Sequence, residues 1–98
     1  MSDDTWGFAP PPFNPEASLV QLKRALRDLG LTERSGGFEL KGLRALEWTL
    51  APDAISIRLA RKLRRSPEWD LRSLRSGADQ RKLLDDIKLR LARWADED

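Results

Sequence analysis

The chain of 98 residues contains no cysteine, no histidine and no tyrosine. Without cysteine it has no disulfide framework, no thiolate nucleophile and no sulfur ligand for zinc. Without histidine it lacks the usual general base near neutral pH and the commonest metal ligand. No arrangement of Ser, Lys and an acid suggests an activated nucleophile. The composition therefore predicts a protein that is not an enzyme and that holds no metal and no cofactor.

Long apolar runs are also missing. No stretch approaches the roughly 18 apolar residues of a membrane span, and the first residues are acidic where a secretory signal is basic. Hydrophobic residues nevertheless make up 40% of the chain, which is enough for a single core in a domain of this length. We expect one folded domain at residues 14–95, in a bacterial-type cytoplasmic protein that makes no membrane contact.

Residues 1–13 are predicted to be a flexible N-terminal arm, because they contain acids, aromatics and three successive prolines at 10–12, which exclude a helix or an interior strand. Two interpretations of its aromatic side chains stay open. They are displayed as a short motif for a partner protein, or they pack back on the domain. The side chains are Trp6, Phe8 and Phe13. At the other terminus, residues 96–98 form an acidic tail, which should fray because negative charge at a helix C-terminus is unfavourable.

Two segments have helical periodicity. Residues 14–16, Asn-Pro-Glu, are typical of a helix start and Gly30 of a helix end. Between them, leucines recur at spacings of three and four, at positions 19, 22, 26 and 29. The second helix is predicted to begin at Ser76, an N-cap followed by an acid three residues later, and to run to about residue 95. Its apolar face consists of Leu83, Leu84, Ile87, Leu91 and Trp94.

Between the helices the periodicity changes to two, as in strands. Apolar and polar residues alternate at 38–41, 46–50 and 55–59, with turns expected at 41–42 and 51–54. For residues 54–65 a helix is the competing interpretation, but Ile57 would then point away from Ile55 and Leu59, so we favour a strand. A weaker fourth strand is expected at 69–74, with Trp69 on its apolar side. The polar stretch 32–37 is expected to be a loop.

These elements predict an α+β domain in the order α-β-β-β-β-α. Its sheet is an antiparallel meander of four strands, or of three if the last does not form. Both helices would pack on the apolar face of the sheet and leave the other face open. Trp48 and Trp69, on the apolar sides of their strands, are expected to belong to the core.

Positive charge is concentrated in one quarter of the chain, because residues 58–82 contain nine basic and three acidic side chains. Arginine suits phosphate, to which its planar guanidinium can donate two hydrogen bonds. We therefore expect an anion-binding patch on the open sheet face and its exit loop. The competing interpretation is a solvated face whose charges protect an open strand edge. The seven predicted residues are Arg58, Arg61, Lys62, Arg64, Arg65, Arg72 and Arg75.

The leading hypothesis is a small non-enzymatic binding domain whose basic sheet face contacts an acidic partner, either nucleic acid, as the more specific choice, or an acidic protein. Against nucleic acid, the sequence has no helix-turn-helix, base-stacking or zinc motif. The alternative is a protein-interaction or self-associating module that uses the N-terminal aromatics or an open strand edge. A monomer is favoured, although the sequence does not fix the oligomeric state.

Overall fold

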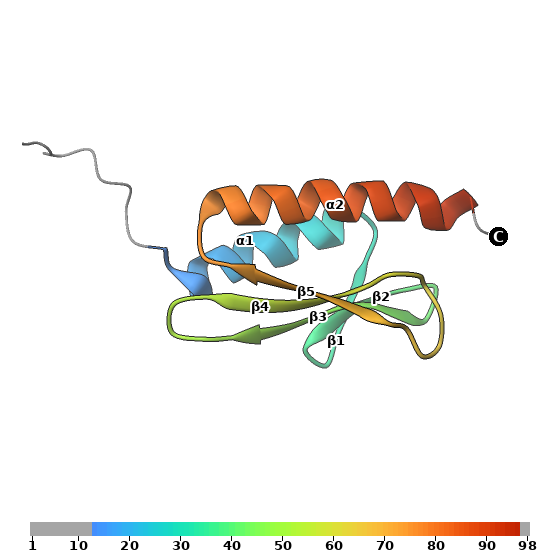
Figure 1. Ribbon diagram of the computed structural model, residues 1–98, viewed down its shortest axis with the longest axis horizontal. Helices are drawn as coiled ribbons and strands as arrows, with labels where there is room; N and C mark the ends of the chain where they lie inside the picture. The colour runs from blue at the N-terminus through green and yellow to red at the C-terminus, as the bar shows by residue number, and fades with distance from the viewer. Residues whose placement is uncertain (1–12, 97–98) are drawn as a thin grey trace, which may run out of the picture.

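Two helices and five strands follow one another in the order α1-β1-β2-β3-β4-β5-α2, in a computed structural model that describes residues 13–96 (Figure 1). Neighbours in sequence are antiparallel neighbours in the sheet, which has the order β1-β2-β3-β4-β5. Both helices lie on one face of this meander (Figure 1). The α+β prediction is therefore confirmed, with one strand more than expected. The elements are α1 (Pro15–Asp28), β1 (Thr32–Arg34), β2 (Gly37–Leu40), β3 (Leu43–Leu50), β4 (Ile55–Ala60), β5 (Trp69–Leu74) and α2 (Gly77–Asp96).

The additional strand is β1, so the prediction of a loop at residues 32–37 was wrong. All three residues of β1 are exposed, and the strand therefore has no apolar alternation by which to recognise it. It pairs with β2 because Ser35 and Gly36 both adopt positive φ, 45° and 75°, as a tight two-residue hairpin turn requires. The turn at Lys41 and Gly42 has the same backbone, with φ of 56° and 79°, and lies where a turn was predicted.

α1 begins and ends where its capping signals predict. The side chain of Asn14 accepts a hydrogen bond from the Ala17 N–H at 3.2 Å. At the other end Gly30 has φ of 95°, and the Leu31 N–H donates to the Leu26 carbonyl at 3.1 Å. This bond closes a Schellman-type cap, which turns the chain back so that Leu31 is buried.

The core lies between the two helices and the face of the sheet that they cover. Ile55, Ile57 and Leu59 alternate with exposed residues along β4 and are all buried, so the strand interpretation of this segment is confirmed over the helix. The helices contribute their predicted apolar faces. Their buried side chains in the core are Leu19, Leu22, Leu26, Leu83, Ile87 and Trp94.

β5 exists as predicted but presents the opposite side to the core. Leu59 pairs with Asp70 and Ile57 with Arg72, and directly paired residues in an antiparallel sheet point to the same face. Asp70 and Arg72 therefore lie on the covered face. Trp69 lies on the open face, so the predicted side was wrong, but it is half-buried there and packs against the core beside its pairing partner Ala60. Trp48, by contrast, is on the covered face, 5.7 Å from the ring of Phe38.

Candidate anion-binding site

The structure separates the seven predicted anion-binding residues. Arg58 lies on the open face of β4, whereas Arg72 lies on the covered face of β5, so the prediction that they share one sheet face was wrong. Arg75 follows the end of β5 remote from the loop that joins β4 to β5, about 20 Å away along the strand. The other four residues belong to that β4–β5 loop, residues 61–68.

On the open face, Arg58 belongs to a row of alternating charges that crosses the sheet. Arg58 contacts Glu47 at 3.4 Å, and Glu47 contacts Arg44 at 3.1 Å. Arg44 and then Arg34 contact Glu39, each at 3.9 Å. Three arginines and two glutamates therefore form one network across four strands, with most of the positive charge compensated, and this part of the face matches the solvated-face interpretation.

A bulge in β3 makes this row possible. Phe38 pairs with Leu46, but Glu39 pairs with Arg44, so Ala45 is an extra residue in β3. Residues 44 and 47 consequently point to the same face although they are three apart. At the far end of the row the Arg58 guanidinium lies 5.0 Å from the ring centre of Trp69, a cation–π contact.

Beneath α2, the charges of β5 are used to attach the helix to the sheet. Arg90 of α2 is buried, with 8% of its surface exposed, and contacts Asp70 at 2.9 Å and Asp86 at 3.0 Å. Its Nη1 also donates to the Ala60 carbonyl at 3.0 Å. Asp70 in turn contacts Arg61 at 2.7 Å. Arg61 therefore has a structural partner, and the network fixes the β5 edge to α2.

The hydrogen bonds of this network shift its pKa values in favour of the charged forms. Those from Arg61 and Arg90 lower the pKa of Asp70, and the bond to Asp70 raises the pKa of Arg61. Burial acts to lower the pKa of Arg90, but its bonds to Asp86 and Asp70 outweigh burial and leave that pKa raised. Asp70, Arg61 and Arg90 are therefore all charged at neutral pH.

Arg72 is held in a similar way. Its Nη2 contacts Asp86 at 3.3 Å, and its Nη1 donates to the Leu71 carbonyl at 3.0 Å. Arg72 therefore connects α2 to the outer edge of β5.

Three cations of the β4–β5 loop differ from Arg58, Arg61 and Arg72, which are paired. Lys62, Arg64 and Arg65 are exposed and form no ion pair with any residue between 13 and 96. The loop that carries them is anchored, because the Arg61 N–H donates to the Glu68 carbonyl at 3.0 Å and Leu63 packs against the core. Trp94 of α2 donates to the Arg61 carbonyl at 3.4 Å, so the last turns of α2 lie beside the loop.

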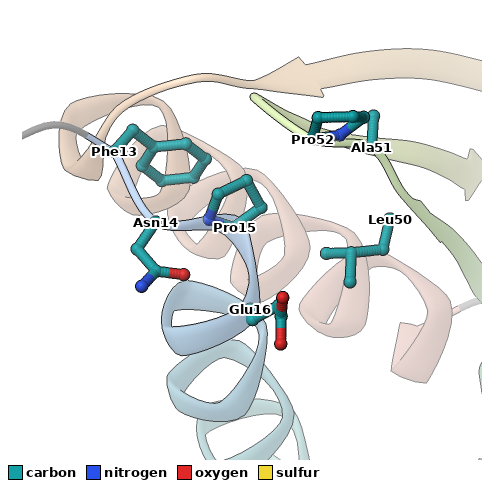
Figure 2. Close-up of a pocket in the computed structure, with 7 residues that line it drawn as sticks. All are labelled: Phe13, Asn14, Pro15, Glu16, Leu50, Ala51 and Pro52. Atoms are coloured by element: carbon teal, nitrogen blue, oxygen red, sulfur yellow. The ribbon is translucent and has the colours of Figure 1, made fainter.

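The described residues that line the cavity in Figure 2 include no pair of catalytic groups. The cavity encloses about 530 Å³ between the first turn of α1 and the β3–β4 turn. Glu16 is the one titratable side chain among the described residues that line it, and a single carboxylate provides no acid–base pair. Phe13 also lines the cavity and packs against the core. Trp6 and Phe8 lie outside the described residues.

Comparisons of the chain with protein-family models, with curated proteins and with solved structures all find no match. Within residues 13–96 no three acidic, His or Cys side chains are grouped so that they could hold a metal ion. Neither helix of the described region is long and apolar enough to cross a membrane.

Proposed function

We propose that this protein is a non-enzymatic domain that binds an anionic partner, most specifically nucleic acid, through the β4–β5 loop. The observation that carries the proposal is that Lys62, Arg64 and Arg65 are exposed and lack ion-pair partners within the described region. Arg58, Arg61 and Arg72, the other basic residues of β4, the loop and β5, each have one.

The anchoring of the loop supports the same function. A cation that already forms an ion pair must give up that partner to bind a phosphate, whereas an unpaired one need not. A loop whose ends are fixed also loses less conformational entropy on binding than a free segment. Two arginines and one lysine at its tip supply planar donors and a point charge for phosphate oxygens.

Binding of a labelled DNA duplex, measured by fluorescence anisotropy, tests the proposal. Each neutralised phosphate contributes about −0.9 to the slope of log affinity against log salt, so three contacts give a slope of about −2.7. Affinity should then fall roughly fortyfold between about 50 and 200 mM salt. The variant Lys62→Ala/Arg64→Ala/Arg65→Ala should lose both the affinity and the slope. Leu63 is retained so that the loop keeps its anchor.

The matched control is Arg24→Ala/Arg81→Ala/Lys82→Ala, which removes two arginines and one lysine from exposed helix positions. It should bind the duplex as the wild type does. Equal loss of affinity in the two triple variants, or no binding at the lower salt concentration, would reject the proposal. A slope near −6 would mean that about seven cations contact phosphate, and would reject a site centred on the loop.

A further inference from the structure

The outer edge of β5 is unpaired, since β4 pairs with one side and no described strand pairs with the other. The hydrogen bond from the Arg61 N–H to the Glu68 carbonyl continues the β4–β5 register and identifies that pair as hydrogen-bonded. Because hydrogen-bonded and other pairs alternate along an antiparallel ladder, residues 70, 72 and 74 direct their backbone groups toward β4. Residues 69, 71 and 73 therefore direct theirs outward.

Two exposed leucines flank this edge. Leu71 is 72% exposed on the open face of the sheet, and Leu89 of α2 is 67% exposed. At about 100° per residue, Leu89 lies some 60° beyond Asp86, on the side of α2 turned away from the core and toward the edge. On α2, Asp86 contacts Arg72 of β5 and Arg90 contacts Asp70 of β5. Leu89 lies between residues 86 and 90 of the helix, so it is level with residue 71, between 70 and 72 of the strand.

A single exposed leucine on a protein surface is ordinary. Here, however, two exposed leucines, one on β5 and one on α2, lie at the same level along the unpaired edge of β5. The outer edge of β5 is also complementary to the same edge of a second copy in antiparallel orientation. With a two-fold axis at Leu71, residue 69 of one chain pairs with 73 of the other, and 71 pairs with 71. All of these residues direct donors and acceptors outward. Residues 70 and 72 then pair on the covered face, so that Asp70 of each chain meets Arg72 of the other.

We propose that this protein forms a homodimer by antiparallel pairing of β5 with β5 of a second copy, around a two-fold axis at Leu71. The dimer joins two five-stranded sheets into one, brings the two Leu71 side chains together on the open face, and brings the two Leu89 side chains together between the α2 helices. Three independent features agree on this register. Residues 69, 71 and 73 direct their backbone groups outward, Asp70 is opposite Arg72 of the second copy, and Leu71 and Leu89 lie at the same position along the edge.

Arg72 has a different position in the single chain and in the dimer. In the single chain its Nη1 caps the outward carbonyl of Leu71 at 3.0 Å. In the dimer that carbonyl accepts from the Leu71 N–H of the second copy, and the guanidinium faces Asp70 of that copy. The three unpaired cations of the β4–β5 loop take no part in the pairing of the two β5 strands. The dimer and the anion-binding site can therefore be tested independently of each other.

Sedimentation equilibrium of the full chain, from micromolar to millimolar concentration, tests the dimer. The wild type should associate to a dimer and no further. Leu71→Asp should raise the dissociation constant by roughly a hundredfold or more, because two buried leucines are lost and two like charges meet. Val20→Asp on α1, also an exposed apolar position, at 58%, is the matched control and should dimerise as the wild type does. Circular dichroism checks that both variants fold.

The register is tested by cross-linking, which the absence of cysteine makes unambiguous. In Leu71→Cys the two cysteines face each other with Cα atoms about 5.5 Å apart, within disulfide range. In Ser73→Cys, on the same face of β5, they are four residues out of register, roughly 13 Å apart. The first variant should therefore oxidise to a covalent dimer and the second should not.

Three results would overturn the proposal. The first is a monomer at every concentration, which would leave Arg72 as a cap that keeps the edge unpaired. The second is equal cross-linking of Leu71→Cys and Ser73→Cys, which would mean that another register or random collision joins the chains. The third is a dimer insensitive to Leu71→Asp, which would place the interface elsewhere.

Discussion

Arg90 is a charged residue at a position of α2 where the helical periodicity predicts an apolar one. It belongs to the buried stripe of α2 with residues 83, 87 and 94, where periodicity calls for an apolar side chain. A buried guanidinium is costly unless it is paired, and Asp70 and Asp86 supply the partners. The position of Arg90 on this stripe is visible in the sequence. Its partner Asp70, 20 residues earlier on another element, is not.

Asp70 should make the stability of the domain depend on pH. Because hydrogen bonds hold its native pKa below the ordinary value of 3.8, the native state binds fewer protons than the unfolded state. Its contribution is complete above that ordinary value and is lost as the pH falls through the native pKa. Asp70→Asn should therefore destabilise the domain above about pH 5, and by less at lower pH.

Urea unfolding at a series of pH values measures this difference. Asp85→Asn is the control, since Asp85 is exposed on α2 and forms no ion pair within the described region. The role given to Asp70 would be contradicted if the stability gap between Asp70→Asn and the wild type stayed constant across the acidic range.

At the scale of the element, the tight turns decide the sheet as much as the hydrophobic pattern does. The turn at Lys41 and Gly42 could be predicted because apolar alternation flanks it on both sides. The turn at Ser35 and Gly36 could not, because β1 has no buried side and only the backbone of the turn makes it a strand. β5 was predicted with the wrong face inward because an edge strand can place charges beneath a helix that pairs with them.

Gly37 should be the least replaceable glycine of the hairpin region. A Cβ atom at this position would collide with the backbone carbonyl oxygen of Leu46 and lie 2.8 Å from the Arg44 guanidinium carbon. The side chain could move, but the carbonyl could not without displacing β3. Gly37→Ala should therefore lower the free energy of unfolding by about 1–3 kcal/mol in urea denaturation.

Gly77, the first residue of α2, gives the comparison. A Cβ there meets nothing within 4 Å, and Gly77→Ala should be neutral or stabilise the helix by up to about 1 kcal/mol. Similar losses of stability in the two variants would contradict the steric argument.

At the scale of the whole molecule, the charged segments of the chain meet the sheet at opposite ends. The β4–β5 loop lies beside the last turns of α2, as the Trp94 contact shows, and α2 ends two residues later at Asp96. Phe13, the first described residue, lies beside the β3–β4 turn, at the other end of β4 (Figure 2). The length of β4, about 20 Å, separates the two ends.

The C-terminal acids should therefore weaken anion binding at the loop more than the N-terminal acids do. Neutralising two of them in Asp96→Asn/Asp98→Asn should tighten duplex binding by about two- to fivefold at low salt, where the screening length exceeds about 10 Å. Asp3→Asn/Asp4→Asn removes the same charge and should have a smaller effect. A larger effect of the second variant would indicate instead that the N-terminal arm reaches over the basic loop and competes there.

The sequence by itself determined six of the seven elements of the described region, all but β1, because caps, turns and periodicity act between neighbouring residues. It placed both helices, the strands at 38–59 and a strand at 69–74. Only the tertiary structure decided which charges are paired. Arg61 meets Asp70 and Arg72 meets Asp86 across gaps of 9 and 14 residues. Charge pairing depends on distance in space, which is why three of the seven predicted cations are held in ion pairs while three on the β4–β5 loop are unpaired within residues 13–96.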